Sequence, residues 1–147
     1  IAYLNCRIKG NVVEEDPYEK NKRRILNYGH TIGHAVESAS GFELLHGEAV
    51  SIGIIAAGMI EQELALADSK RHDRVLKMLK NLDVPVKLPA NLSDNTVIDL
   101  IKRDKKAVNK WPKFVLIDKI GQVHTQNGQY AVEVAPEIVN KVLCKLK

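Results

Sequence analysis

The longest apolar run in the sequence is the feature that most restricts how this chain can fold. It covers Ala49–Ile60, twelve residues interrupted only by Ser51. A helix that crosses a bilayer needs about 20 apolar residues, so the run is too short to span a membrane. A helix that is apolar on nearly all sides has to be enclosed by other elements. We therefore expect a central helix over about Glu48–Ala67. Its small residues allow neighbouring backbones to approach closely: Gly53, Ala56, Ala57 and Gly58.

Most of the remaining chain also has a helical pattern. The first segment, Ile1–Val13, is either the end of a helix or an irregular lead-in, and the pattern leaves both open. Ser93 is a suitable N-cap for one of the later helices, and Gly41 a suitable C-cap for the first long one. The helices expected beside the central one cover about Tyr18–Ala39, Ser69–Leu82, Asp94–Asp104 and Pro136–Leu146.

A small amount of β-structure is expected late in the chain. Phe114–Asp118 and Val123–Thr125 are short β-prone runs joined by a segment that contains Gly121, which is typical of a hairpin. Tyr130–Val134 is a candidate third strand. The sequence therefore predicts a mainly α domain over residues 1–147, with a small antiparallel β element near its C-terminus.

Composition excludes several classes of protein. Of the 147 residues, 45% are hydrophobic and 27% charged, which is ordinary for a globular domain and excludes a disordered chain. The net charge of +4 comes from interleaved basic and acidic residues with few aromatics, so we expect no binding to nucleic acid. Only Cys6 and Cys144 are present, too few for a disulfide framework. With no export signal recognisable, we expect a cytoplasmic protein that does not bind membranes.

The opening residues suggest that the domain belongs to a longer protein. The chain starts with Ile1, and Ile1–Ile8 reads like the middle of an element. We therefore expect an excised domain whose missing half holds part of the functional site.

An unusual polar stripe follows the first long helical pattern. Its residues are spaced 4, 4, 3, 4 and 3 positions apart, which places them on one face of a helix. A solvated face is the simpler explanation, but such faces favour Lys and Glu. Two glycines four residues apart, Gly29 and Gly33, also destabilise a helix by about 1 kcal/mol each relative to alanine. These features favour a functional face. The stripe consists of Glu19, Arg23, Asn27, His30, His34 and Glu37.

The histidines in and near this stripe point to a metal or acid–base site. His30 and His34 are four residues apart and can converge on one metal ion, and His46 follows at a helix connection. A zinc-protease helix needs Glu directly after the first His, and Thr31 stands there instead. Of the other two histidines, His72 is expected at the surface, and His124 at the surface or in a structural role.

The sequence around these histidines resembles the signature of 3-dehydroquinate synthases, members of the sugar-phosphate cyclase superfamily. The motif runs from Arg23 to Glu37 (RRILNYGHTIGHAVE) and continues at His46–Val50 (HGEAV). The segment Cys6–Val13 resembles the family's lysine-bearing lead-in, and Asp104–Lys106 its late lysine loop. The resemblance extends over essentially the whole chain but implies only the C-terminal, helical half of such an enzyme.

The resemblance implies a lyase of the shikimate pathway, which leads to the aromatic amino acids. The family converts 3-deoxy-D-arabino-heptulosonate 7-phosphate to 3-dehydroquinate and phosphate. NAD transiently oxidises a ring hydroxyl, phosphate is eliminated, the ketone is reduced again, and the ring opens and recloses by an aldol step. A divalent metal, Zn²⁺ or Co²⁺, holds hydroxyls and polarises the transient ketone.

The resemblance also implies roles for individual residues. His30 and His46 match the two metal-binding histidines, and the third ligand is a Glu of the N-terminal half. This differs from the spacing argument, because His34 matches a catalytic and substrate-pocket histidine near the phosphate. Glu19 matches an active-site carboxylate, and Glu37 and Glu48 match positions that orient neighbours or cap helices. The substrate-binding matches are Lys9, Arg23, Asn27, His34 and either Lys105 or Lys106.

The implied partners are the small phosphorylated sugar acid, an N-terminal NAD-binding domain absent from this chain, and a second copy in a homodimer. No glycine-rich dinucleotide fingerprint occurs here, since Gly29 and Gly33 belong to the histidine motif. The fragment alone is therefore expected to be inactive.

Two alternatives stay open. One is another sugar-phosphate cyclase, such as a 2-deoxy-scyllo-inosose or a valiolone synthase. Valiolone-type enzymes tend to carry Pro at the position of His34, and inosose-type enzymes tend to lose the pattern of Arg23 and Asn27. Retention of all three favours a substrate with both a carboxylate and a phosphate. The other alternative is a non-catalytic metal-binding module.

Overall fold

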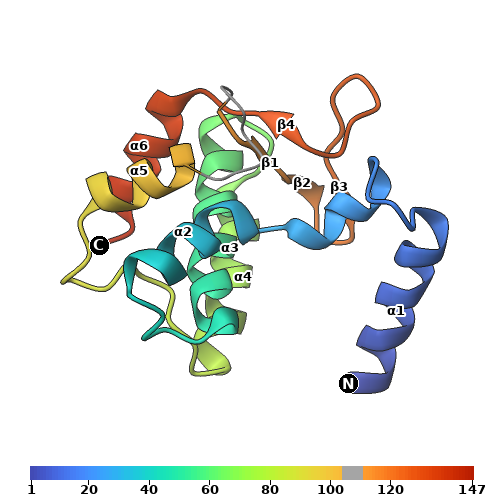
Figure 1. Ribbon diagram of the computed structural model, residues 1–147, viewed down its shortest axis with the longest axis horizontal. Coiled ribbons are helices and arrows are strands. Elements are labelled where there is room, and N and C mark those ends of the chain that lie inside the picture. The colour runs from blue at the N-terminus through green and yellow to red at the C-terminus, as the bar shows by residue number, and fades with distance from the viewer. Residues whose placement is uncertain (104–110) are drawn as a thin grey trace.

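The central helix expected from the apolar run is present as α3, His46–Glu63. The computed structural model describes residues 1–103 and 111–147. In Figure 1, α3 runs through the middle of the domain. Ala49, Ile52, Ala56 and Ile60 of α3 are completely buried. Around it lie α2 (His30–Ala39), α4 (Ser69–Asn81) and α6 (Pro136–Lys145), with α5 (Asp94–Arg103) packed on α2 and α6.

The single long helix expected over Tyr18–Ala39 is wrong. The chain forms a short 3-10 helix, η1 (Lys22–Asn27), and α2 begins only at His30. Between them Gly29 has a φ of 77°, in the left-handed region where a residue without Cβ is favoured. The six polar residues therefore do not share one continuous helix face.

Close packing against α3 explains this break. A Cβ added to Gly29 would lie 2.8 Å from the backbone nitrogen of Ile54, and a Cβ added to Gly53 would lie 2.0 Å from the Gly29 carbonyl oxygen. The two backbones meet where neither residue has a side chain. This tertiary contact overrides the helical periodicity of the sequence.

The lead-in segment forms a helix, α1 (Ala2–Glu15), which projects away from the helical body (Figure 1). Val12 is its buried residue, whereas Leu4 and Ile8 on the same helix are more than half exposed. An apolar stripe of α1 is therefore left uncovered by the described part of the chain.

Within residues 1–103 and 111–147 the β-structure is antiparallel, as expected, but it forms two small sheets. β2 (Ile117–Lys119) pairs with β3 (Gln122–Val123), which confirms the hairpin. β1 (Lys113–Phe114) pairs with β4 (Val132–Glu133). The expected strand Phe114–Asp118 is thus divided between two partners. The class predicted from the sequence, mainly α with a small antiparallel element near the C-terminus, is confirmed, and among the described residues no helix is long and apolar enough to cross a membrane.

Candidate metal and substrate site

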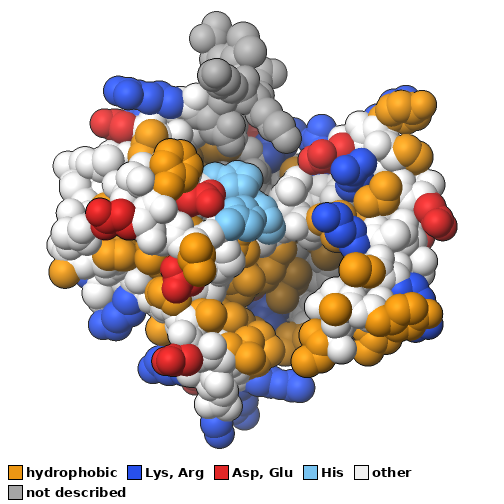
Figure 2. Space-filling model, turned by 60° about the horizontal axis from the view of Figure 1, so that its bottom comes forward, with side chains coloured by type: hydrophobic (Ala, Val, Ile, Leu, Met, Phe, Trp, Pro, Cys, Tyr) orange, Lys and Arg blue, Asp and Glu red, His pale blue; other side chains and the backbone are white. Residues whose placement is uncertain are grey.

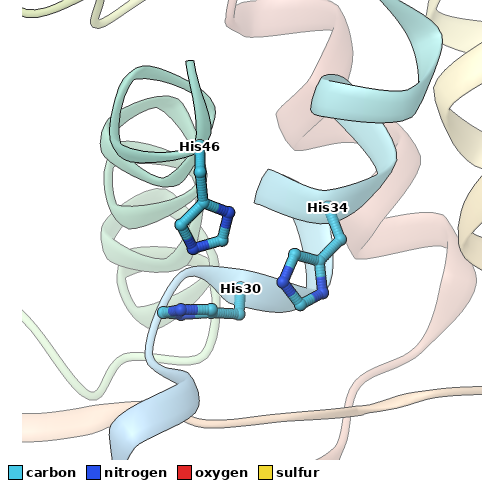
Figure 3. A group of neighbouring side chains, drawn as sticks. All are labelled: His30, His34 and His46. Atoms are coloured by element: carbon cyan, nitrogen blue, oxygen red, sulfur yellow. The ribbon is translucent and has the colours of Figure 1, made fainter. Parts of the chain in front are cut away.

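Three histidines meet where α2 and α3 begin. His30 opens α2, His34 lies one turn later, and His46 opens α3. Figure 3 shows the three rings around one common space between the two helix starts. Each residue offers a ring nitrogen, and these atoms all lie within 4.8 Å of one another. The centroids of the rings are 5.3–5.5 Å apart. The packing of α2 on α3 has therefore brought together residues from two separate segments.

The ring of His30 is oriented by a hydrogen bond to the backbone. Its Nδ1 lies 3.1 Å from the carbonyl oxygen of Tyr28, a distance at which Nδ1–H donates to the oxygen. That hydrogen bond fixes the tautomer in which Nε2 carries the lone pair. Metal-binding histidines almost always donate their second ring N–H in this way.

The ring of His46 has a carboxylate partner. Its Nδ1 lies 3.3 Å from Oε2 of Glu37, a half-buried residue on α2. A carboxylate on Nδ1 orients the imidazole and raises the basicity of Nε2. Glu37 thus contacts and orients a neighbour, one of the two roles left open for it above. Glu48 serves as a cap, since its Oε2 accepts a hydrogen bond of 2.8 Å from the backbone N–H of Leu45.

Substituting Glu37 with glutamine tests its contribution to the histidine site. The amide keeps the shape but loses the charge that supports His46, so we expect the affinity for Zn²⁺ to fall about 10-fold, at the lower end of the range for outer-shell partners. Competition with a chromophoric chelator measures the change. Glu43→Gln is the matched control, an exposed carboxylate on the connection between α2 and α3. Equal affinities of the two variants would contradict the role of Glu37.

The donor set fits zinc or cobalt. Imidazole nitrogens suit both metals. A metal ion held by these histidines would keep coordination positions open for substrate and for a further ligand. Figure 2 shows the histidines at the edge of a hollow in the molecular surface. Hydrophobic side chains form the floor of the hollow, and Lys and Arg side chains lie on the side opposite the histidines. The arrangement is suited to a small anionic ligand beside a cation.

Two of the predicted site residues, one expected as an active-site carboxylate and one as a substrate-binding residue, are in contact with each other. The Asn27 side-chain amide donates a hydrogen bond of 3.0 Å to Oε1 of Glu19. Glu19 has a φ of 53°, so it lies in a turn and not on the helix that the spacing predicted. The two side chains are in contact, although the argument that placed them on one helix face is wrong.

Arg23 is fixed by a turn whose role at the site was not predicted from the sequence. The carboxylate of Asp16 accepts hydrogen bonds from the backbone N–H groups of Lys20, Asn21 and Arg23, at 2.8–3.0 Å. These donors lower the pKa of Asp16 to about 2. The Arg23 guanidinium donates to the carbonyl oxygen of Pro17 at 2.9 Å. An Asp directly before a Pro was the available sequence signal for a turn.

Of the predicted lysines, Lys9 alone lies among the described residues. Lys9 is exposed on α1, and in residues 1–103 and 111–147 no hydrogen bond or ion pair connects it to the histidines. Lys105 and Lys106, one of which was expected to contact the phosphate, lie outside the described residues. Their predicted roles are therefore untested.

The two remaining histidines differ from each other. His124 pairs with Asp118 at 2.7 Å beside the hairpin, in agreement with a structural or surface role. His72, expected at the surface, is half-buried on α4 and faces Gly58 of α3. Burial lowers the pKa of His72.

The chain resembles known proteins in both sequence and structure. Residues 1–107 match the family model described as 3-dehydroquinate synthase C-terminal. The 3-dehydroquinate synthase of Ruminiclostridium cellulolyticum is 46% identical over 84% of this chain and 34% of its own length. That of Nostoc punctiforme is 40% identical over 97% of this chain and 38% of its own length. The chain therefore spans little more than a third of the relatives it matches.

Solved structures of sugar-phosphate cyclases share the fold. A 2-deoxy-scyllo-inosose synthase complexed with carbaglucose-6-phosphate, NAD⁺ and Co²⁺ has a TM-score of 0.85 at 27% identity, over 95% of this chain and 38% of its own. A 2-epi-5-epi-valiolone synthase from Streptomyces hygroscopicus with NAD⁺ and Zn²⁺ bound has a TM-score of 0.76 at 25% identity, over 92% of this chain and 36% of its own.

Proposed function

Because the chain belongs to the 3-dehydroquinate synthase family, we propose that it is the metal- and substrate-binding half of such an enzyme. The reaction is the conversion of 3-deoxy-D-arabino-heptulosonate 7-phosphate to 3-dehydroquinate and phosphate. The observation that carries this proposal is the convergence of His30, His34 and His46. In two of the three rings, Nδ1 has a hydrogen-bond partner outside the cluster. Relatives of this name at 36–46% identity support it.

His30 and His46 are assigned as the metal ligands, through Nε2. Their Nδ1 atoms already have the carbonyl and carboxylate partners typical of metal-binding histidines. Zn²⁺ or Co²⁺ bound there would hold substrate hydroxyls and act as a Lewis acid. His34 is assigned to the phosphate side of the substrate, next to the metal. The alternative, in which all three histidines bind the metal, follows from the spacing alone.

The remaining residues are assigned to binding and orientation. Arg23 offers a planar guanidinium, which matches a carboxylate in two parallel hydrogen bonds. Asn27 and Glu19 already hydrogen-bond to each other, which would orient the amide towards substrate hydroxyls. Lys9, and Lys105 or Lys106, are assigned to the carboxylate and phosphate on the basis of the family resemblance.

The NAD site and the third metal ligand are assigned to the part of the relatives that this chain does not cover. A metal site in which two histidines are the only protein ligands would hold its metal weakly. The exposed apolar side chains of α1, among them Leu4 and Ile8, are a surface that such a domain would cover. We therefore expect this chain alone to release no phosphate, and the protein with both halves to be a cytoplasmic homodimer.

The test is an assay of phosphate release by the protein with both halves, supplied with NAD, Zn²⁺ and the heptulosonate phosphate. Turnover of this substrate supports the proposal. The second candidate, a 2-deoxy-scyllo-inosose synthase, is favoured by the TM-score of 0.85 to that enzyme. Turnover of a hexose phosphate in place of the heptulosonate phosphate would establish it instead. If neither substrate reacts, the non-catalytic metal-binding alternative replaces both.

Substituting Arg23 with lysine distinguishes a carboxylate substrate from others. Lysine keeps the charge but cannot form two parallel hydrogen bonds to a carboxylate. Loss of a charge-assisted hydrogen bond costs about 1.5–3 kcal/mol, so kcat/KM for the heptulosonate phosphate should fall at least about 10-fold. Arg24→Lys, on the same 3-10 helix, is the control. Equal kcat/KM values for the two variants would remove Arg23 from the proposed site.

A further inference from the structure

A buried carboxylate lies near the C-terminal end of the central helix α3. Glu61 of α3 is 1% exposed, and the apolar run ends directly before it. Both of its oxygens are used. Oε1 accepts a hydrogen bond of 2.8 Å from the backbone N–H of Ile117, and Oε2 one of 2.6 Å from the Arg71 guanidinium. Arg71 also donates to the carbonyl oxygen of Ile117 at 2.8 Å. Glu61 thus connects α3 with α4 and β2.

Stability alone is a weak reason for this arrangement. Removing a carboxylate and a guanidinium from water is costly, and well-packed apolar residues often stabilise a core as well as a buried ion pair does. Burial raises the pKa of Glu61, although Arg71 and the Ile117 N–H act in the opposite direction. A buried pair of this kind does, however, provide a rigid and directional anchor for a third polar group.

That third group is the hydroxyl of Tyr28. The Tyr28 side chain lines the same small pocket as Glu61, Arg71 and Ile117. There the Glu61 carboxylate interacts with the Tyr28 hydroxyl, and burial together with this neighbour raises the pKa of Tyr28. The backbone carbonyl of the same residue holds Nδ1 of His30 at 3.1 Å. Tyr28 therefore contacts the buried ion pair with its side chain and the histidine site with its backbone.

Gly29, the residue after Tyr28, is also fixed by its contacts with the central helix. Gly29 adopts its left-handed conformation directly against the backbone of Gly53 and Ile54 on α3. With the Tyr28 side chain anchored on one side and Gly29 packed on the other, the peptide group between them has little freedom to rotate. The direction of the Tyr28 carbonyl, and with it the His30 ring, is set by contacts outside the site.

We infer that Tyr28 is a positioning residue for His30, acting through its hydroxyl on the Glu61–Arg71 pair and through its carbonyl on Nδ1. The inference rests on the proposed metal role of His30. Its structural part, the orientation of the ring, can be tested without metal.

The test is Tyr28→Phe in the full chain, which removes only the hydroxyl. We expect the Zn²⁺ affinity to fall about 10-fold, as for an outer-shell partner, in competition with a chelator. In the metal-free chain, long-range ¹⁵N–¹H NMR spectra should show that the His30 ring loses its preference for the Nδ1–H tautomer. Tyr3→Phe, which removes an exposed hydroxyl on α1, should change neither quantity.

A second variant, Glu61→Gln, keeps the shape of the anchor but weakens its acceptor, and should shift both measurements in the same direction. Circular dichroism at the working temperature confirms that each variant is folded. The inference is overturned if folded Tyr28→Phe has a lower melting temperature but unchanged Zn²⁺ affinity and His30 tautomer, because the hydroxyl would then be only structural. If the unmodified chain binds no Zn²⁺, the metal proposal fails, while a changed tautomer in Tyr28→Phe still supports the positioning role.

Discussion

Replacing His46 with alanine should lower the affinity of the chain for Zn²⁺ by about 100- to 1000-fold. Apparent zinc-binding free energies of about 10–16 kcal/mol, shared among four ligands, correspond to about 2.5–4 kcal/mol for each. His46 also carries the contact through which Glu37 supports the site, so that both are lost together. In the protein with both halves, the same substitution should nearly abolish phosphate release.

The fold should survive this change. The His46 side chain is 55% exposed at the first position of α3 and contributes little to the core. The melting temperature of His46→Ala should therefore stay close to that of the unmodified chain, and the loss of Zn²⁺ should be measurable by calorimetric titration of a folded protein. His124→Ala, which removes a histidine paired with Asp118 beside the hairpin, is the control. Similar Zn²⁺ affinities for the two variants would exclude His46 as a ligand.

Replacing Gly53 with alanine should destabilise the chain by about 3 kcal/mol or more. The added Cβ would lie 2.0 Å from the Gly29 carbonyl oxygen and 2.8 Å from the Gly33 nitrogen, both of them backbone atoms of the opposing segment. Overpacking a core usually costs about 1–3 kcal/mol, and a contact between backbones has no flexible side chain that can move aside. Relief therefore requires α2 to separate from α3.

The consequence reaches the histidines, because α2 carries His30 and His34 and α3 carries His46. We expect Gly53→Ala to show both a lower free energy of unfolding in urea and weaker Zn²⁺ binding. Gly10→Ala is the control, since nothing lies within 4 Å of a Cβ at Gly10 and alanine favours the helix α1. A stability of Gly53→Ala equal to that of Gly10→Ala would contradict the close approach of α2 and α3.

The sequence predicted the class of the fold because its strongest patterns are local. An apolar run such as Ala49–Ile60 has to be enclosed wherever it occurs, which gave α3 its central place. The hairpin around Gly121 depends on turn chemistry within a few residues, and it is present as β2 and β3. The histidine cluster was also predictable in part, because His30 and His34 share a helix face at any position in the fold.

Other predictions were wrong because periodicity ignores what a segment packs against. The spacing from Glu19 to Glu37 fits a single helix, yet the chain leaves the helical conformation at Gly29, where its backbone meets Gly53. The strand expected over Phe114–Asp118 is divided for a similar reason. Its first residue pairs with Val132, and Ile117 pairs with Val123.

By itself, the sequence determined a mainly α domain around one buried helix, and a histidine motif whose family resemblance points to metal and an anionic substrate. Only the tertiary structure decided that His46 joins His30 and His34, that Glu37 and the Tyr28 carbonyl contact two of the rings, and that the Tyr28 side chain shares a pocket with the buried Glu61. The physical reason is that these contacts join segments far apart in the chain, and their geometry depends on how closely two glycine-bearing backbones can approach.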